Sequence, residues 1–318
     1  MIHAGLYYPA GSLKAQLCIE GASRLYSFCA SNAVPADRCG KLVVATSPEE
    51  IAELDELRAR AAANGVERAE VVDRRFVRAR EPRVEALAAL WSPNTGRVDA
   101  SALVRALLRR AEENGAVFLP DSRVIGGQPQ KDTFEVSLER ETFRARTIVN
   151  AAGLLADEVS AALRGETFTI YPCRGEYAEL RPSRRAWVKG LVYPLPHASG
   201  HGLGVHLTRT TDGNVLLGPT IRYQQRKDDY ENDRIPLEDF VTAARQMLPD
   251  LTLDDVTYGG SGIRAKLHPP EERFADFMIR QDTACPRLIH AAGIDSPGLT
   301  ACLAIAIRIR TLVAEILG

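Results

Sequence analysis

The sequence has 318 residues, of which 45% are hydrophobic and 25% are charged, as in an ordinary globular protein. This length exceeds the usual size of one domain, so we expect one large or two interleaved domains. The 40 basic and 41 acidic side chains give a net charge of −1. This balance argues against nucleic acid or an anionic membrane as a general partner, and any attraction for an acidic ligand must come from a local cluster.

The cysteines and the apolar segments argue against several other protein classes. The six cysteines are scattered and include no Cys-x-x-Cys pair, so neither a zinc site nor a disulfide framework is expected. We expect reduced, mostly buried thiols in a cytoplasmic protein. The N-terminus lacks the pattern of a signal peptide, and the longest apolar tract, residues 299–307, is too short to span a bilayer.

The first half of the chain alternates predicted helices and strands. The sequence Ser47-Pro48-Glu49-Glu50 is typical of a capping box and predicts a helix that runs to about residue 64. Residues 100–113 have the apolar spacing of a second helix. The apolar run 116–119 predicts a short strand, and residues 134–138 alternate strictly between apolar and polar, as a half-buried strand does.

The second half is expected to contain more antiparallel structure. Residues 146–150 predict a strand that leads into small residues and a helix. Several antiparallel strands are expected in 188–218, followed by a helix at 237–247 between two prolines. The chain closes with a predicted strand at 287–291, a tight loop and a helix over 299–317. The mixture predicts an α/β fold with a substantial antiparallel component.

The segment from Leu288 to Thr300 carries the strongest chemical indication. It brings a strand to small residues, which let the backbone approach a ligand closely, and then to the start of a long helix. The free N–H groups and positive dipole end of that helix suit a group that becomes anionic, such as the N1–C2=O edge of a reduced flavin. An ordinary strand–loop–helix with Gly298 as a turn residue is the alternative. Residues 147–157 repeat the pattern more weakly.

Several strings are similar to those of the L-2-hydroxyglutarate dehydrogenases and oxidases, and they occur in family order along nearly the whole chain. They are residues 2–15 (IHAGLYYPAGSLKA), 39–46 (CGKLVVAT), 174–177 (RGEY), 193–196 (YPLP), 203–208 (LGVHLT), 262–264 (GIR) and 293–300 (GIDSPGLT). The chain therefore resembles this family of D-amino-acid-oxidase-like FAD enzymes.

The resemblance implies two interwoven domains and FAD as the cofactor. We expect an FAD-binding domain and a substrate domain built on an antiparallel sheet. The first is assigned to residues 1–40, 91–165 and 265–318, and the second to residues 41–90 and 166–264.

One expected part of this family is not found in the sequence. Family members begin with a strand, a Gly-x-Gly-x-x-Gly turn and a helix, which hold the FAD pyrophosphate. The nearest match, residues 200–205, has the wrong spacing. We therefore expect this segment to be missing, and the chain to bind FAD poorly. The family usually has valine in place of Met1, so an internal GTG codon read as the start is a hypothesis that the upstream DNA tests.

Oxidation of a 2-hydroxyacid requires a cation for the carboxylate and a base near the hydroxyl. The resemblance places Arg174 and Arg264 in the substrate region, where an arginine can hold a carboxylate with two hydrogen bonds. The alternative is a structural ion pair, for Arg174 with Glu176. Tyr193 is expected to bind substrate or simply to pack.

Histidines are the preferred bases, because their pKa lies near neutrality. The resemblance places His3 near the flavin ring and His206 on a strand facing it, so both are catalytic candidates, although a strand histidine is often structural. His290 is expected to pack. Lys266 is a possible helper or a solvated lysine. Residues His197, His201 and His268 look like surface residues, because they lie in loops rich in proline and glycine.

The cofactor-binding residues follow from the same resemblance. We expect them to be His3, Gly5, Val124, Ala151, Ala152, Gly153, Gly293, Ile294, Ser296, Pro297, Gly298, Leu299 and Thr300, and we expect no metal.

The predicted reaction is oxidation of L-2-hydroxyglutarate, or a close 2-hydroxyacid, to the 2-oxoacid, with hydride passing to FAD. The electron acceptor, whether a quinone, an electron carrier or oxygen, is left open, and a quinone would place the protein at the membrane surface. The alternatives are another enzyme of the superfamily, which oxidises an amine or glycerol 3-phosphate, and a flavin-free remnant without catalysis.

Overall fold

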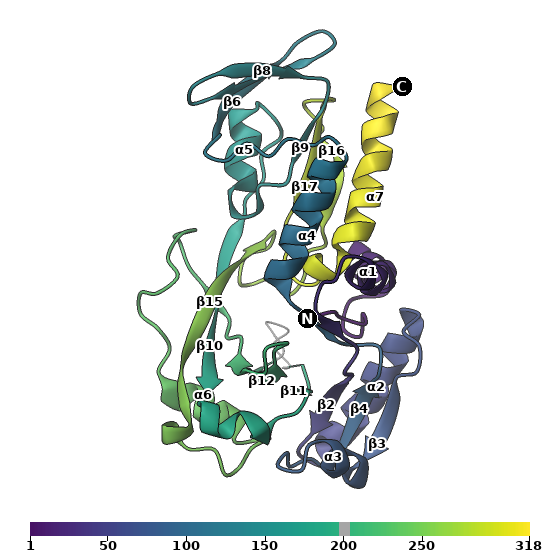
Figure 1. Ribbon diagram of the computed structural model, residues 1–318, viewed down its shortest axis with the longest axis vertical. Helices are drawn as coiled ribbons and strands as arrows, with labels where there is room; N and C mark the ends of the chain where they lie inside the picture. Colours follow the sequence, from purple (N-terminus) through teal and green to yellow (C-terminus); the bar gives the residue numbers. More distant parts are fainter. Residues whose placement is uncertain (197–203) are drawn as a thin grey trace.

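A computed structural model describes residues 1–196 and 204–318. The molecule is elongated, with a large sheet in the lower part of Figure 1 and a smaller group of strands and helices in the upper part. His197, His201 and most of the nearest match to the glycine fingerprint, residues 200–203, lie outside the described residues.

In the described part of the chain, nine strands from two separate stretches form the largest sheet. Its strands are, in order, β14 (Arg222–Tyr223), β10 (Tyr171–Leu180), β13 (Val215–Gly218), β12 (His206–Arg209), β11 (Leu191–Pro194), β2 (Lys41–Ala45), β4 (Ala88–Ser92) and β3 (Glu70–Asp73), and β15 (Val256–Lys266) also pairs with β10. All neighbours are antiparallel except β11 and β2, which are parallel. That parallel pair joins residues 41–92 to residues 171–266.

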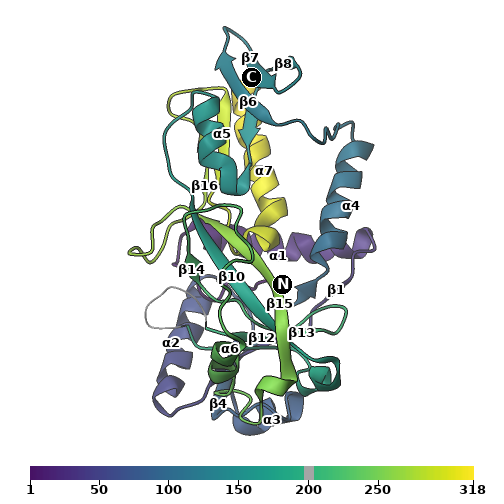
Figure 2. The same ribbon diagram turned by 90° about the vertical axis from the view of Figure 1, so that its left-hand side faces the viewer.

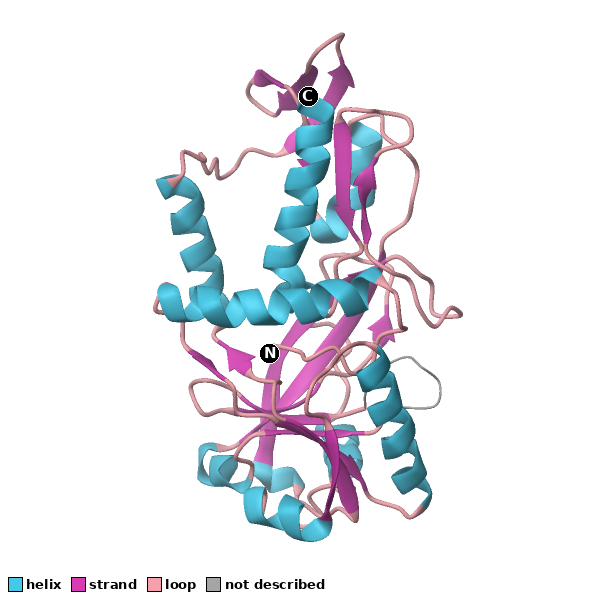
Figure 3. Cartoon of the chain, turned by 90° about the vertical axis from the view of Figure 1, so that its right-hand side faces the viewer, coloured by secondary structure: helices cyan, strands magenta, loops and turns pink. Residues whose placement is uncertain are grey.

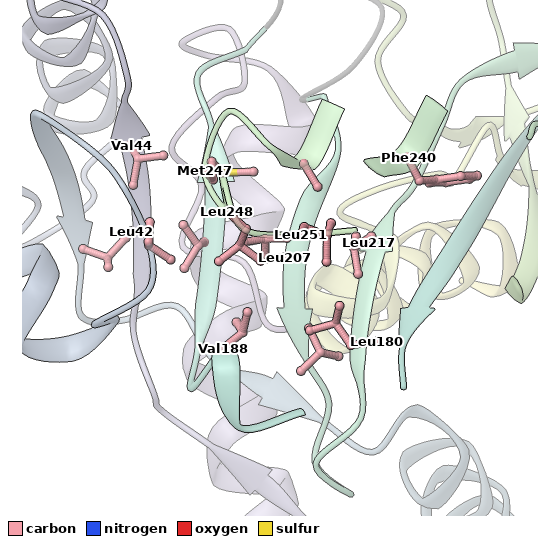
Figure 4. Close-up of a cluster of buried hydrophobic side chains, with 14 of the residues drawn as sticks. Leu42, Val44, Leu180, Val188, Leu207, Leu217, Phe240, Met247, Leu248 and Leu251 are labelled. Carbon is pink, nitrogen blue, oxygen red and sulfur yellow. The ribbon is translucent and has the colours of Figure 1, made fainter. Parts of the chain in front are cut away.

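Both faces of this sheet are covered, which explains why residues 42–45 of β2 are all apolar. Because successive strand residues point to opposite faces, Leu42 and Val44 enter one core while Val43 and Ala45 enter another. Figure 4 shows the first core, where α6 (Leu237–Ala244) and the turn after it pack on the sheet. The second core lies under α2 (Glu49–Ala63), and α3 (Arg74–Arg80) follows β3.

The upper part holds two small sheets and the C-terminal helix. The first sheet is β16 (Met278–Gln281), β17 (Leu288–Ala292) and β9 (Ile148–Asn150), in which β9 and β17 are parallel. The second is the meander β6 (Val124–Pro129), β7 (Phe134–Leu138) and β8 (Thr142–Ala145). The helices are α5 (Ala156–Ala162), α7 (Gly298–Leu317) and α4 (Ala100–Glu113), and α4 stands away from α7 in Figure 2. Short elements complete the fold: β1 (Ala36–Asp37), β5 (Arg97–Val98), η1 (Gly153–Leu155), η2 (Pro182–Trp187) and η3 (Leu253–Asp255).

Helix α1 (Leu13–Ser31) lies across the middle of the molecule, between α7 and the large sheet (Figure 3). Its first N–H groups are capped from a distance, because the Asp276 carboxylate accepts hydrogen bonds from Leu13 and Lys14 at 2.6 and 2.9 Å. A glycine permits close contact with α7: a Cβ on Gly21 would lie 2.5 Å from the Thr300 carbonyl oxygen. Helix α1 therefore fixes the position of the start of α7.

The mixed α/β class and most of the predicted elements are confirmed. The predicted helices at 100–113 and 299–317 and the strands at 134–138 and 287–291 are present within one residue at each end. The predicted strand at 116–119 is wrong, since this run is an exposed loop whose Phe118 is 60% exposed. The capping box is only half formed: the Ser47 side chain does not cap α2, whereas the Glu50 carboxylate accepts from the Thr46 and Ser47 N–H groups.

The sequence predicts reduced, mostly buried cysteines and no helix that spans a bilayer. All six cysteines lie in the described residues and are free thiols, four of them buried. Within residues 1–196 and 204–318, none of the helices has the length and apolar character needed to cross a bilayer.

Candidate functional site

The loop between β17 and α7 is held from two sides. The Asp295 carboxylate pairs with Lys14 of α1 at 2.6 Å and with Lys266 of β15 at 3.1 Å. Lys266 is therefore bound to the loop, not simply solvated. Gly293 has φ +65°, which favours glycine at the point where the chain leaves the strand. This anchoring fixes the entry to α7.

The start of α7 presents unused hydrogen-bond donors. Among the described residues, the backbone N–H groups of Leu299 and Thr300 find no acceptor, and α7 has no side-chain cap. Leu299 is exposed, whereas Gly298 and Thr300 are buried. Free N–H groups and the positive end of the helix dipole favour a ligand edge that carries negative charge.

His3 lies directly beside this helix start. Its backbone N–H donates to Thr300 Oγ1 at 3.0 Å, and its ring Nε2 is hydrogen-bonded to Ser296 Oγ at 3.2 Å. Ser296 also contacts the Tyr8 hydroxyl at 3.4 Å. Burial, and next the positive charge of Lys41, hold the pKa of His3 well below its usual value. The imidazole is therefore neutral near pH 7 and able to take part in proton transfer.

A second layer of side chains is buried and contacts Met1. Tyr193 and His206 stack with ring centroids 3.5 Å apart and planes within 16°, and they are only 1% and 6% exposed. The Tyr193 hydroxyl donates to Met1 Sδ at 3.1 Å. Lys41 also belongs to this layer, because its ammonium lies over the Tyr193 ring. Lys41 was not predicted as a site residue, although a lysine at the start of an otherwise apolar strand was a usable signal.

The two predicted substrate arginines have different surroundings. The Arg174 guanidinium is buried and paired with Glu176 at 3.0 Å, and Nη2 also donates to the Asn232 carbonyl at 2.6 Å. The alternative of a structural ion pair therefore describes what Arg174 does here. By contrast, both Nη atoms of Arg264 donate to the Thr220 carbonyl at 3.2 Å.

Arg264 has no carboxylate partner in the part of the chain that the structure describes. Its guanidinium lies flat against Gly175 on the neighbouring strand β10, where an added Cβ would be 2.6 Å from Nη2. The glycine of the Arg-Gly-Glu-Tyr string is thus needed for this close approach. An arginine without a carboxylate partner is suited to hold the carboxylate of a ligand.

A separate cavity of about 720 Å³ lies in the upper part of the molecule. Val124, Ala151 and Ala152 line it, while Gly153 does not. The Thr147 hydroxyl, also in the lining, is buried and has no hydrogen-bond partner among the residues that the structure describes. An unpaired buried hydroxyl is costly, so it favours a polar ligand group at this place.

The remaining predicted residues have structural surroundings. Gly5 has φ +95° and faces Ile19 of α1, which a Cβ would approach to 2.9 Å. His290 is buried and bound to Asp282 at 2.7 Å, as expected for a packing residue. The expectation that His268 is a surface residue is wrong: it is 4% exposed, with the Tyr223 hydroxyl 3.3 Å from its ring.

A family model matches nearly the whole chain. Residues 1–311 match the family model described as DAO, FAD dependent oxidoreductase. The chain belongs to this family of FAD dependent oxidoreductases. The resemblance inferred from the short strings, the enzyme class and the FAD cofactor are thereby confirmed at the level of the family.

Two relatives with similar sequences share the name L-2-hydroxyglutarate dehydrogenase. L-2-hydroxyglutarate dehydrogenase of Escherichia coli K12 is 30% identical over 353 residues, covering 100% of this chain and 83% of that protein. The mitochondrial enzyme of that name from Caenorhabditis elegans is 32% identical over 348 residues, covering 96% of this chain and 80% of the other.

Solved structures establish the fold. L-α-glycerophosphate oxidase from Mycoplasma pneumoniae with FAD bound has a TM-score of 0.88 at 24% identity and covers 98% of this chain and 83% of its own. Glycine oxidase from Geobacillus kaustophilus has a TM-score of 0.82 at 18% identity, and the match covers 99% of this chain and 82% of that protein. At these identities the likeness concerns architecture alone.

The residues of this chain fit the FAD of its family at two places. The unpaired N–H groups of Leu299 and Thr300 suit the acceptor edge of the flavin ring. The cavity with the unpaired Thr147 hydroxyl suits a polar part of the nucleotide. FAD supplies a hydride acceptor when it is bound.

Proposed function

We propose that this protein oxidises L-2-hydroxyglutarate, or a closely similar 2-hydroxyacid, to the corresponding 2-oxoacid. The observation that carries the proposal is the Arg264 guanidinium, which has no carboxylate partner in the described residues and is fixed by the Thr220 carbonyl. The shared name of the relatives, which align with nearly the whole chain, supports the substrate class.

In the proposed complex, the substrate carboxylate binds Arg264 through paired hydrogen bonds. His3 accepts the hydroxyl proton at Nε2, because its neutral ring already lies next to Ser296. Ser296 orients this ring. His206 is the second candidate base and Tyr193 a further candidate for substrate binding, and both side chains are buried.

The remaining site assignments form part of this proposal. FAD would be held by His3, Gly5, Val124, Ala151, Ala152, Gly153, Gly293, Ile294, Ser296, Pro297, Gly298, Leu299 and Thr300. Residues 41–90 and 166–264 would form the substrate domain, with Arg174 as the other candidate for substrate binding, and residues 1–40, 91–165 and 265–318 would form the FAD domain. We further propose a cytoplasmic location, at the membrane surface if a quinone is the acceptor.

A substrate panel on protein refolded with excess FAD tests the proposal. We expect L-2-hydroxyglutarate to be oxidised in preference to D-2-hydroxyglutarate, glycerol 3-phosphate and glycine. Arg264→Met should raise KM by about 100-fold or more, since a charge-assisted bidentate contact is lost. Arg105→Met, an exposed change on α4, is the control. Preferred oxidation of an amine or of glycerol 3-phosphate would refute the proposal. Testing whether a quinone, an electron carrier or oxygen reoxidises the reduced flavin identifies the electron acceptor.

A further inference from the structure

A second cationic side chain lies on the face of β15 that carries Arg264. Side chains alternate between the two faces of a strand, so Arg264 and Lys266 share one face, with Cα atoms about 7 Å apart. Opposite them on β10 lie Cys173 and Tyr171. The Arg264 guanidinium accordingly contacts Cys173 Sγ at 3.8 Å. Both cations therefore belong to the same side of the sheet.

A row of contacts joins the two cations across this face. Tyr223 of β14 is paired with Cys173 from the other side of β10, and its hydroxyl lies 3.3 Å from Nδ1 of His268. The other ring nitrogen of His268, Nε2, lies 3.5 Å from Lys266 Nζ. Arg264 and Lys266 thus border one group of side chains, formed by Cys173, Tyr223 and His268.

Lys266 also connects this face to the start of α7. Its ammonium pairs at 3.1 Å with the carboxylate of Asp295, in the loop that enters α7. The next residue of that loop, Ser296, is hydrogen-bonded to Nε2 of His3 at 3.2 Å. Lys266 therefore links the strand that carries Arg264 to the loop that contacts His3.

The charge of Lys266 is only partly neutralised by the protein. Asp295 is shared by Lys14 and Lys266, and within residues 1–196 and 204–318 it is the only carboxylate at ion-pair distance from either, so one positive charge is in excess. Lys14 is the more enclosed lysine, since its side chain is 7% exposed against 17% for Lys266, and its ammonium lies over the rings of Phe274 and Phe277. A partly buried cation in excess favours an anionic ligand, and Lys266 is the one that a ligand can reach.

We propose that Lys266 binds the second carboxylate of the substrate, so that a dicarboxylate is held between Arg264 and Lys266. This assignment rests on the proposed function for the identity of the reacting end. The planar guanidinium of Arg264, fixed by the Thr220 carbonyl, suits the carboxylate whose orientation must be set beside the reacting carbon. The ammonium of Lys266 acts as a point charge on a flexible stem, which suits a distal carboxylate whose orientation matters less. Lys266 is therefore the residue that selects a dicarboxylate over a monocarboxylate.

The test compares two substrates on protein refolded with excess FAD. L-2-hydroxypentanoate has the five carbons of L-2-hydroxyglutarate but a methyl group in place of the distal carboxylate. In Lys266→Met we expect KM for L-2-hydroxyglutarate to rise by about 10- to 100-fold while kcat/KM for L-2-hydroxypentanoate stays near that of the parent, because a charge-assisted contact to the distal carboxylate alone is lost. Lys266→Arg keeps the charge and should retain most of the preference for the dicarboxylate.

Lys14→Met is the matched control, since it removes the other ion pair of Asp295. If Lys266 only anchored the loop, both lysine variants would lower kcat/KM for the two substrates alike. We expect that uniform loss in Lys14→Met, with the ratio of the two kcat/KM values unchanged. An unchanged ratio in Lys266→Met, or a fall of equal size in Lys14→Met, would overturn the proposal. Lys266→Gln replaces Lys266→Met, with the same expected result, if the latter does not fold by circular dichroism.

A binding measurement separates this proposal from the proposed function. If neither hydroxyacid is oxidised, the proposed function fails, and calorimetric titration of the same FAD-loaded protein with glutarate and with pentanoate still tests Lys266. We expect the parent to bind glutarate at least about 10-fold more tightly than pentanoate, and Lys266→Met to lose this difference. Equal affinities in the parent, or a preference that survives in Lys266→Met, would overturn the role given to Lys266.

Discussion

Gly175→Ala should impair substrate binding while leaving the fold intact. The added Cβ would lie 2.6 Å from Nη2 of Arg264 and 3.0 Å from Cζ, where ordinary contacts begin at 3.4 Å. The guanidinium must therefore move by about 0.8 Å, which stretches its two 3.2 Å hydrogen bonds to Thr220 beyond the usual range. Displacing a substrate-positioning group by about 1 Å can lower the activity of an enzyme by about 100-fold. We therefore expect the KM of Gly175→Ala to rise by about 10- to 100-fold.

The assay compares KM for L-2-hydroxyglutarate with stability in urea. Because the displaced group is the end of a flexible side chain, the free energy of unfolding should change by less than about 1 kcal/mol. Gly262 is paired with Gly175 in the ladder between β10 and β15, and a Cβ there would meet no atom within 4 Å. Gly262→Ala is thus a matched control with unchanged KM. A parental KM in Gly175→Ala would refute the role given to Arg264.

Three further changes test the fold. Gly21→Ala brings a Cβ within 2.5 Å of the Thr300 carbonyl oxygen, so we expect the free energy of unfolding in urea to fall by about 1–2 kcal/mol. An unchanged free energy of unfolding would mean that α1 and α7 can separate freely. Asp255→Asn should lower the free energy of unfolding by about 1–2 kcal/mol at pH 7, because the hydrogen bond from Arg184 lowers the pKa of Asp255 to about 2. The difference in unfolding free energy between parent and variant should fade as the pH falls from about 4 to about 2. A difference that persists at pH 2 would contradict this. Phe118→Ser should alter the unfolding free energy by less than about 0.5 kcal/mol, because the ring is 60% exposed; a larger loss would indicate that this loop packs.

Much of the fold could be predicted from local patterns. The helix at 100–113 has a strongly one-sided apolar pattern and an Asp99 side-chain cap, so its bounds were predicted correctly. The run 116–119 was predicted as a strand because it is short and apolar, yet none of the strands in residues 1–196 and 204–318 pairs with it. Its conformation depends on tertiary contacts, which the local sequence does not report.

The site was harder to predict because residue type does not reveal partners. Arg174 and Arg264 lie on paired strands and look alike in sequence, but Glu176 neutralises the first and a backbone carbonyl holds the second. Lys41 was missed because its significance comes from burial between two rings that are distant in sequence. His268 was assigned to the surface from its proline-rich loop, although the Tyr223 hydroxyl and the end of β15 contact it.

A crystal structure of the protein with FAD and 2-oxoglutarate is the decisive experiment. We expect the flavin ring to lie against the start of α7, with its acceptor edge on the N–H groups of Leu299 and Thr300. We also expect a 2-oxoglutarate carboxylate paired with Arg264 and the reacting carbon within reach of His3. A ring bound away from α7, or a carboxylate that does not touch Arg264, would contradict these expectations.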